Sequence, residues 1–327
     1  MSDKMSAERT GGCTTKACAP SGYAGSLAVN IGSLSLKNPV MTASGTFGYG
    51  REYAALYDLS LLGAVVVKGT TLNPREGNTP PRVVETPAGM LNAIGLQNPG
   101  TEAFLATELP FLREQNVAVI LNIAGHTIGE YEEITRRVDG AEGLSAIEVN
   151  ISCPNLDEGG MTFGVSPRLS AQVVSGVRRA TRLPVIAKLS PNVTSVVEIA
   201  KACVDSGADA ISLINTLVGI VIDLKKKRPV LGNVTGGLSG PAIRPVAVRM
   251  TWEVSSAVAV PVIGMGGIAS AEDALEFIMA GATAVQVGSA VFANPRAPLE
   301  VIEGLRKYAR DEKLASITSL IGIAKQK

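Results

Sequence analysis

The sequence predicts a single (β/α)8 TIM barrel with loops inserted at its C-terminal face. Its 327 residues accommodate one barrel of about 250 residues with additions. Eight short aliphatic runs lack apolar-polar alternation, as is typical of parallel strands buried on both faces. The segments between them repeat apolar residues at helical spacing. Because a doubly wound sheet needs only about six strands, eight strands that each lead to a helix favour the closed barrel.

The expected barrel strands are short and rich in Val, Ile, Leu and Ala. In chain order they cover residues 39–43, 64–68, 117–122, 146–150, 184–189, 210–215, 261–264 and 284–288. A weak internal repeat, in which Gly-Ala precedes a strand, occurs at residues 62–65, 207–211 and 281–285. This repeat indicates successive βα units.

The helices between these strands have recognisable limits. Apolar residues at spacings of three and four from Val196 to Val204 predict a helix that Gly207 ends. Ser270, followed by Ala-Glu-Asp, has the composition of a capped helix start.

The domain organisation is simple. We expect residues 1–24 to be a disordered N-terminal extension and residues 25–327 to form one barrel domain. Two long segments, 70–93 and 216–240, follow strands and are the inserted loops.

Composition excludes several classes of protein. Lys and Arg number 30 against 29 Asp and Glu, a formal charge of +1, and no basic stripe is present, so nucleic acid is not an expected partner. No apolar run reaches the about 18 residues of a membrane span, and residues 1–24 lack a signal-peptide core. We therefore expect a cytoplasmic protein.

Cysteine and histidine are too few for most metal or hydrolase sites. The four cysteines show no disulfide framework. Cys13 and Cys18 could contribute two thiols to a metal site, but a tetrahedral site needs four ligands and the chain has one histidine, so we expect no metal. A hydrolase triad could use only His126, which is interpreted more simply as a solvated loop residue.

The residues that close the strands predict a ligand site. Strand ends in a TIM barrel form the active-site face, and buried lysines and asparagines are costly there unless something pairs them. The strands close in order on Ser44, Lys68, Asn122, Asn150, Lys188, Asn215, Gly266-Gly267 and Gly288-Ser289.

The glycines after the last two strands predict a phosphate site, because their backbone amides can converge on an anion. The ligand could be a flavin mononucleotide or a sugar phosphate. Lys188 could stabilise negative charge on a reduced flavin, and Lys68 could contact both a cofactor and an anionic substrate.

We expect two further groups of residues to lie at the same active-site face of the barrel. Cys153 could be a thiolate base or a small buried side chain, and its position leaves these interpretations about even. Four asparagines, with amides that both donate and accept, suit a ring of alternating N–H and C=O groups; they are Asn92, Asn150, Asn155 and Asn215.

With these motifs in order, residues 25–315 resemble the dihydroorotate dehydrogenases, specifically the class 1B catalytic subunit. The resemblance is carried by segments 43–48 (ASGTFG), 67–71 (VKGTT), 92–98 (NAIGLQN), 150–155 (NISCPN), 214–216 (INT) and 236–241 (GGLSGP).

The resemblance implies one FMN per chain and a pyrimidine substrate, dihydroorotate or its product orotate. The implied FMN contacts are Ser44, Lys68, Gly69, Asn122, Asn150, Lys188, Ile214, Gly240, Gly266, Gly267, Gly288 and Ser289. The implied substrate contacts are Lys68, Asn92, Ala93, Ile94, Gly95, Leu96, Asn150, Asn155, Asn215 and Thr216.

The resemblance also implies a mechanism within pyrimidine biosynthesis. Cys153 would take the C5 proton, and the C6 hydrogen would leave as hydride to flavin N5. A cysteine base is typical of class 1 enzymes, whereas the membrane-associated class 2 uses serine.

Class 1B implies a partner that carries FAD and a 2Fe-2S cluster and passes electrons to NAD+. The assembly would be a heterotetramer in which a homodimer of this chain binds two electron-transfer subunits. Three alternatives stay open at this point: a fumarate-linked class 1A homodimer, a dihydropyrimidine dehydrogenase-like reduction of uracil or thymine, and a flavin-binding subunit without catalysis.

Overall fold

The computed structural model describes residues 25–152, 154–155 and 161–325. Within them, eight parallel strands close into a barrel, and every predicted barrel strand is confirmed. In barrel order the strands are β3 (Val40–Thr42), β4 (Ala64–Val66), β7 (Ala118–Ile123), β8 (Leu144–Asn150), β11 (Val185–Lys188), β12 (Ala210–Leu213), β17 (Val262–Met265) and β18 (Ala284–Val287). The barrel closes where β18 pairs with β3, with Val285 opposite Val40.

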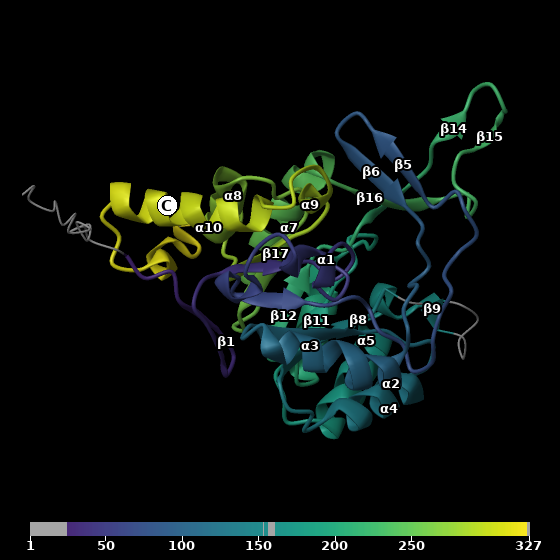
Figure 1. Ribbon diagram of the computed structural model, residues 1–327, viewed down its shortest axis with the longest axis horizontal. Coiled ribbons are helices and arrows are strands. Elements are labelled where there is room, and N and C mark those ends of the chain that lie inside the picture. The colour runs from purple at the N-terminus through teal and green to yellow at the C-terminus, as the bar shows by residue number, and fades with distance from the viewer. Residues whose placement is uncertain (1–24, 153, 156–160, 326–327) are drawn as a thin grey trace, which may run out of the picture.

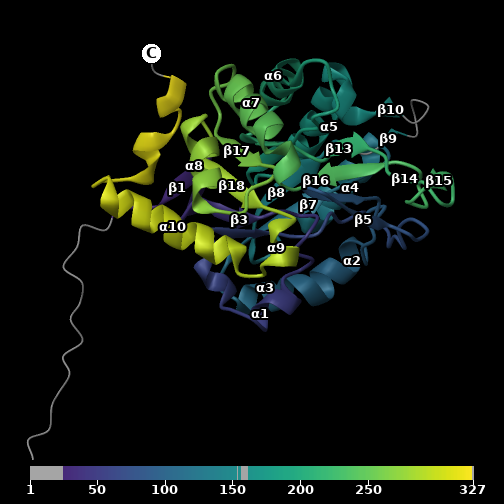
Figure 2. The same ribbon diagram turned by 90° about the horizontal axis from the view of Figure 1, so that it is seen from above.

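Helices surround the barrel on its outside (Figures 1 and 2). They are α1 (Arg51–Ala54), α2 (Thr101–Ala103), α3 (Leu109–Glu114), α4 (Ile128–Val138), α5 (Pro167–Ala180), α6 (Val196–Asp205), α7 (Arg244–Ser255), α8 (Ala271–Met279), α9 (Ala290–Ala293) and α10 (Ala297–Asp311). Because strands are covered on both faces, their side chains are buried almost without exception, which explains the continuous aliphatic runs.

The predicted helix limits are confirmed. Helix α6 ends just before Gly207, which has a φ of 100° and so adopts the left-handed conformation that favours glycine after a helix. Helix α8 begins with a capping box, in which Ser270 accepts from the backbone N–H of Asp273 and the Asp273 carboxylate accepts in return from Ser270.

The two inserted segments form one structure. Strands β5 (Val83–Thr86) and β6 (Gly89–Asn92) come from the first insertion, and β13 (Leu217–Gly219) and β16 (Gly236–Ser239) come from the second. Together they make a four-stranded antiparallel sheet in the order β13-β16-β6-β5, with Gly237 opposite Asn92. The sequence predicted both insertions, but not this pairing between them.

Short hairpins complete the described chain. Strands β1 (Val29–Ile31) and β2 (Leu34–Leu36) form a hairpin that contributes to the core, and β9 (Pro154–Asn155) pairs with β10 (Met161–Thr162). The hairpin of β14 (Ile222–Asp223) and β15 (Arg228–Pro229) projects away from the barrel (Figure 1). Among the described residues, no helix is long and apolar enough to cross a membrane.

Candidate active site

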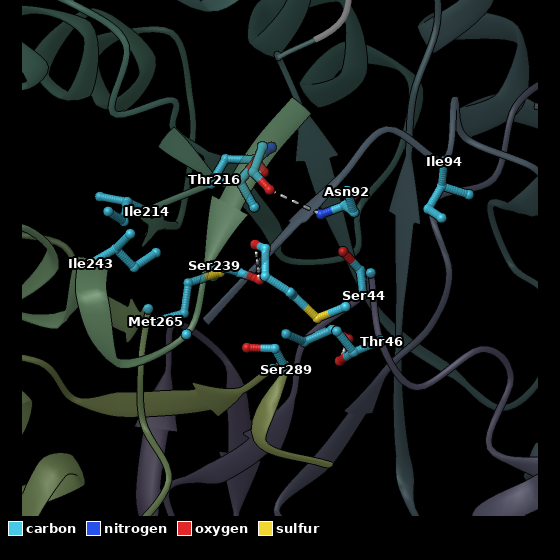
Figure 3. A pocket seen from close by; sticks show the side chains of 18 of the residues that line it. Ser44, Thr46, Asn92, Ile94, Ile214, Thr216, Ser239, Ile243, Met265 and Ser289 are labelled. Atoms are coloured by element: carbon cyan, nitrogen blue, oxygen red, sulfur yellow. Dashed lines mark hydrogen bonds between the residues drawn. The ribbon is translucent and has the colours of Figure 1, made fainter. Parts of the chain in front are cut away.

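A cavity of about 1080 Å³ lies between the carboxyl ends of the barrel strands and the four-stranded sheet. Its volume lies just above the about 300–1,000 Å³ that ligand sites commonly occupy. Figure 3 shows apolar Ile214, Ile243 and Met265 on one side, and polar Ser44 and Ser289 on another. The cavity can therefore hold a large ligand with one apolar and one polar flank.

Nearly all residues named from the sequence meet in this cavity. The predicted FMN contacts that line it are Ser44, Lys68, Gly69, Asn122, Asn150, Lys188, Ile214, Gly240, Gly266, Gly267, Gly288 and Ser289. The predicted substrate contacts that line it are Lys68, Asn92, Ala93, Ile94, Gly95, Leu96, Asn150, Asn215 and Thr216.

Two predicted residues cannot be located in the cavity. Cys153 lies outside the described residues. Asn155 is described only as backbone in β9, where it pairs with Met161 of β10. The assignment of these two residues to the site stays a prediction, as does the disorder expected for residues 1–24, which also lie outside the described chain.

Two lysines, Lys68 and Lys188, contribute positive charge to the cavity lining. Lys188 Nζ donates to Ser44 Oγ at 3.1 Å and lies 3.6 Å from Glu148 Oε1. Burial, followed by the nearby charge of Lys188, lowers the pKa of Lys68 below the ordinary lysine value. Two ammonium groups that line one cavity favour an anionic ligand, because each is partly desolvated and the two repel each other.

The asparagines form a connected polar edge. Asn215 Nδ2 donates to Ser152 Oγ at 3.0 Å and to Asn150 Oδ1 at 3.4 Å. Tyr131, fully buried on α4, donates its hydroxyl to the Asn150 carbonyl oxygen at 2.7 Å. The backbone of Asn150 is thus anchored from behind the barrel, while its carboxamide stays at the cavity.

The glycine pair after β17 is required by the backbone. Gly266 and Gly267 have φ values of 128° and 77°, conformations that favour glycine. A Cβ on Gly266 would stand 2.8 Å from the Ala247 Cβ, and one on Gly267 would stand 2.7 Å from the Gly240 carbonyl oxygen. Side chains are therefore excluded at both positions, which belong to the cavity lining.

Sequence reasoning gave no role to two buried polar residues of the barrel. Gln286 on β18 lines the cavity, and Glu148 on β8 lies fully buried beneath it. The Oδ1 atom of Asn122 and the Oε1 atom of Gln286 are buried and accept no hydrogen bond within the described chain. In the sequence, Glu148 and Gln286 each stand as a polar residue inside an otherwise aliphatic run, and this pattern could have identified them.

His126 lies in a loop, as expected, and is half-buried; it also lines the cavity and contacts Arg75, with 2.6 Å between His126 Nε2 and Arg75 Nη1. Over the described part of the chain, no group of three or more His, Cys, Asp or Glu residues could hold a metal ion.

Fold and cavity together define a TIM barrel with a polar, cationic ligand site at the carboxyl ends of its strands. The sequence profile of one family, described as dihydroorotate dehydrogenase, matches residues 26–308. The chain belongs to the dihydroorotate dehydrogenase family, whose members are flavin-dependent oxidoreductases.

Similar proteins carry a more specific description. The chain is 59% identical over 296 residues to the "dihydroorotate dehydrogenase B (NAD(+)), catalytic subunit" of Trichlorobacter lovleyi, an alignment covering 90% of this chain and 97% of that protein. Proteins of the same description are 58% identical in Pelobacter propionicus, with the same coverage, and 58% identical in Desulforudis audaxviator, covering 91% of this chain and 97% of that protein.

Proposed function

We propose that this chain catalyses the FMN-dependent oxidation of (S)-dihydroorotate to orotate in pyrimidine biosynthesis. The observation that carries the proposal is the meeting of Lys68, Asn92, Asn150 and Asn215 in one cavity of a dihydroorotate dehydrogenase family barrel. Dihydroorotate is a cyclic amide with a carboxylate. Its groups match a cation beside side chains that both donate and accept hydrogen bonds.

The residues present fit FMN. Lys188 and Asn122 line the cavity with polar side chains that Glu148 holds in place, and the glycine backbone at Gly266 and Gly267 lies in the cavity wall, where N–H groups can approach a phosphate. When bound, FMN would accept the hydride equivalent from the substrate C6. The predicted cofactor contacts that line the cavity would hold it, with Lys188 stabilising negative charge on the flavin ring.

The chain's own residues would bind and orient the substrate above the flavin. Lys68 would pair with the substrate carboxylate, while Asn92 and Asn215 would hold the ring amides. The predicted substrate loop at residues 92–96 continues from β6, so the four-stranded sheet would position it.

Cys153 would be the base that removes the C5 proton. The decisive test is Cys153→Ala, with Cys203→Ala as the matched control, because Cys203 is buried on α6 and absent from the cavity lining. Cys153→Ala should bind FMN normally and slow flavin reduction by dihydroorotate about 10²-fold or more. Near-normal reduction would remove Cys153 from the base role.

The electron acceptor would be NAD+, reached through a separate subunit with FAD and a 2Fe-2S cluster. The relatives are described as NAD+-linked catalytic subunits, which supports a heterotetramer of two such chains and two electron-transfer subunits. Purification from the native host tests this: a yellow-brown complex that reduces NAD+ is expected. A homodimer active with fumarate alone would contradict it and favour the class 1A alternative.

Substrate identity has its own test. Dihydroorotate should reduce the bound flavin far faster than dihydrouracil, because only dihydroorotate carries a carboxylate for Lys68. Faster reduction by dihydrouracil would favour the dihydropyrimidine dehydrogenase-like alternative. Cytoplasmic location stays a prediction from the sequence.

A further inference from the structure

A buried carboxylate links four polar groups beneath the cavity. Glu148 on β8 is 0% exposed and does not line the cavity. Its Oε1 accepts from Asn122 Nδ2 at 2.7 Å and lies 3.6 Å from Lys188 Nζ. Its Oε2 accepts from Gln286 Nε2 at 2.7 Å and from Ser212 Oγ at 2.9 Å. One side chain therefore touches groups from four other barrel strands, β7, β11, β12 and β18.

This arrangement fixes which way two carboxamides point. A carboxylate only accepts hydrogen bonds, so Asn122 and Gln286 must both turn their NH2 groups toward Glu148. Their oxygens consequently face away from it. Neither oxygen has a hydrogen-bond partner in the described chain, and neither is exposed at the cavity surface; the side chains of Asn122, Gln286 and Lys188 that Glu148 contacts nevertheless belong to the cavity lining.

Glu148 does not line the cavity, so it can act on a ligand only through the lining side chains that it contacts, which are Asn122, Lys188 and Gln286. We propose that Glu148 is a positioning residue for the flavin. It holds the carboxamides of Asn122 and Gln286 and the ammonium of Lys188 in fixed orientations at the wall of the cofactor site. The inference rests on the proposed function in that FMN is the ligand.

The substitution Glu148→Gln tests the inference, because it keeps the size of the side chain while it removes the negative charge and one hydrogen-bond acceptor. The NH2 group of a glutamine at position 148 would face the NH2 group of either Asn122 or Gln286, so that carboxamide must rotate and this part of the cavity wall is rearranged. We expect the dissociation constant for FMN, measured by flavin fluorescence, to rise about tenfold or more. The flavin midpoint potential should become more positive, because a negative charge beside Lys188 is lost.

The matched control is Glu142→Gln, the same change at a side chain that is 80% exposed, which should alter neither quantity. Circular dichroism checks that each variant is folded. Adding Asn122→Asp to Glu148→Gln provides rescue. The new carboxylate can accept from the amide introduced at position 148 and restores a negative charge to the network. The double variant should bind FMN more tightly than Glu148→Gln alone.

The inference would be overturned if Glu148→Gln folds and keeps the wild-type FMN dissociation constant and flavin midpoint potential. It would also be overturned if the double variant binds FMN no more tightly than Glu148→Gln. If Glu148→Gln does not fold, Ser212→Ala decides. Ser212 contacts Glu148 without lining the cavity, and its loss should weaken FMN binding by about threefold or more; unchanged affinity would refute the inference.

The two proposals fail in different ways. A wild-type protein that binds FMN but is not reduced by dihydroorotate would contradict the proposed reaction and leave the role of Glu148 intact. A wild-type protein reduced by dihydroorotate, together with a Glu148→Gln variant of unchanged affinity and potential, would contradict only the role of Glu148.

Discussion

Replacing Lys188 by Met should destabilise the FMN-free protein measurably. The Lys188 side chain is only 7% exposed and pairs with Glu148 and Ser44. Removing one partner of a buried ion pair costs about 3–5 kcal/mol, since the other charge stays buried. Two effects reduce this cost. Glu148 keeps three hydrogen-bond donors, and Lys68 is freed from the charge that helps to lower its pKa. We expect a loss of about 2–3 kcal/mol.

Chemical denaturation of the FMN-free protein, followed by circular dichroism, measures this loss. Lys201→Met is the control, because Lys201 is exposed on α6, and it should change the free energy of unfolding by less than about 0.5 kcal/mol. Combining Lys188→Met with Glu148→Gln should cost less than the sum of the two single changes, because the uncompensated charge is gone. The reasoning would be refuted if Lys188→Met lowered the free energy of unfolding by less than about 1 kcal/mol. It would also be refuted if the effects of Lys188→Met and Glu148→Gln were strictly additive.

Three further outcomes are expected. Because burial and Lys188 lower the pKa of Lys68, its ammonium is lost at a lower pH than in an ordinary lysine; the KM for dihydroorotate should rise as pH increases through that pKa, and a flat alkaline profile would contradict the carboxylate role. Tyr131→Phe removes the buried hydrogen bond to the Asn150 carbonyl and should lower the free energy of unfolding by about 1–2 kcal/mol; denaturation curves that superimpose on wild type would show that this bond adds nothing. Burial raises the pKa of Cys203 to about 12, so peptide mass spectrometry should find Cys203 alkylated by iodoacetamide only after unfolding, and equal labelling of native protein would disprove its burial.

The barrel was predictable because its physical requirement is simple. A parallel strand covered on both faces must be aliphatic throughout, and the run at 210–215, seen as β12 (Ala210–Leu213), meets that requirement without help from distant residues. The sheet over the cavity was not predictable. Strand β16 contains Gly236 and Gly237 and pairs with Asn92 and Leu91, contacts between distant parts of the chain that no local pattern specifies.

Most residues of the site could be predicted from the geometry of the barrel. In a barrel, residues that close strands converge, so the order of strands along the chain is enough to group Lys68, Asn122 and Lys188. Glu148 and Gln286 were given no role because each lies within a strand rather than at its end. Their importance depends on hydrogen-bond partners from other strands, which a linear sequence does not display.

The most direct test of the central claim is an anaerobic visible spectrum of the FMN-loaded protein before and after dihydroorotate is added. Our account predicts that the oxidised flavin band bleaches, because dihydroorotate reduces FMN in the cavity that Lys68 and the asparagines line. A yellow protein whose band persists with dihydroorotate would contradict it.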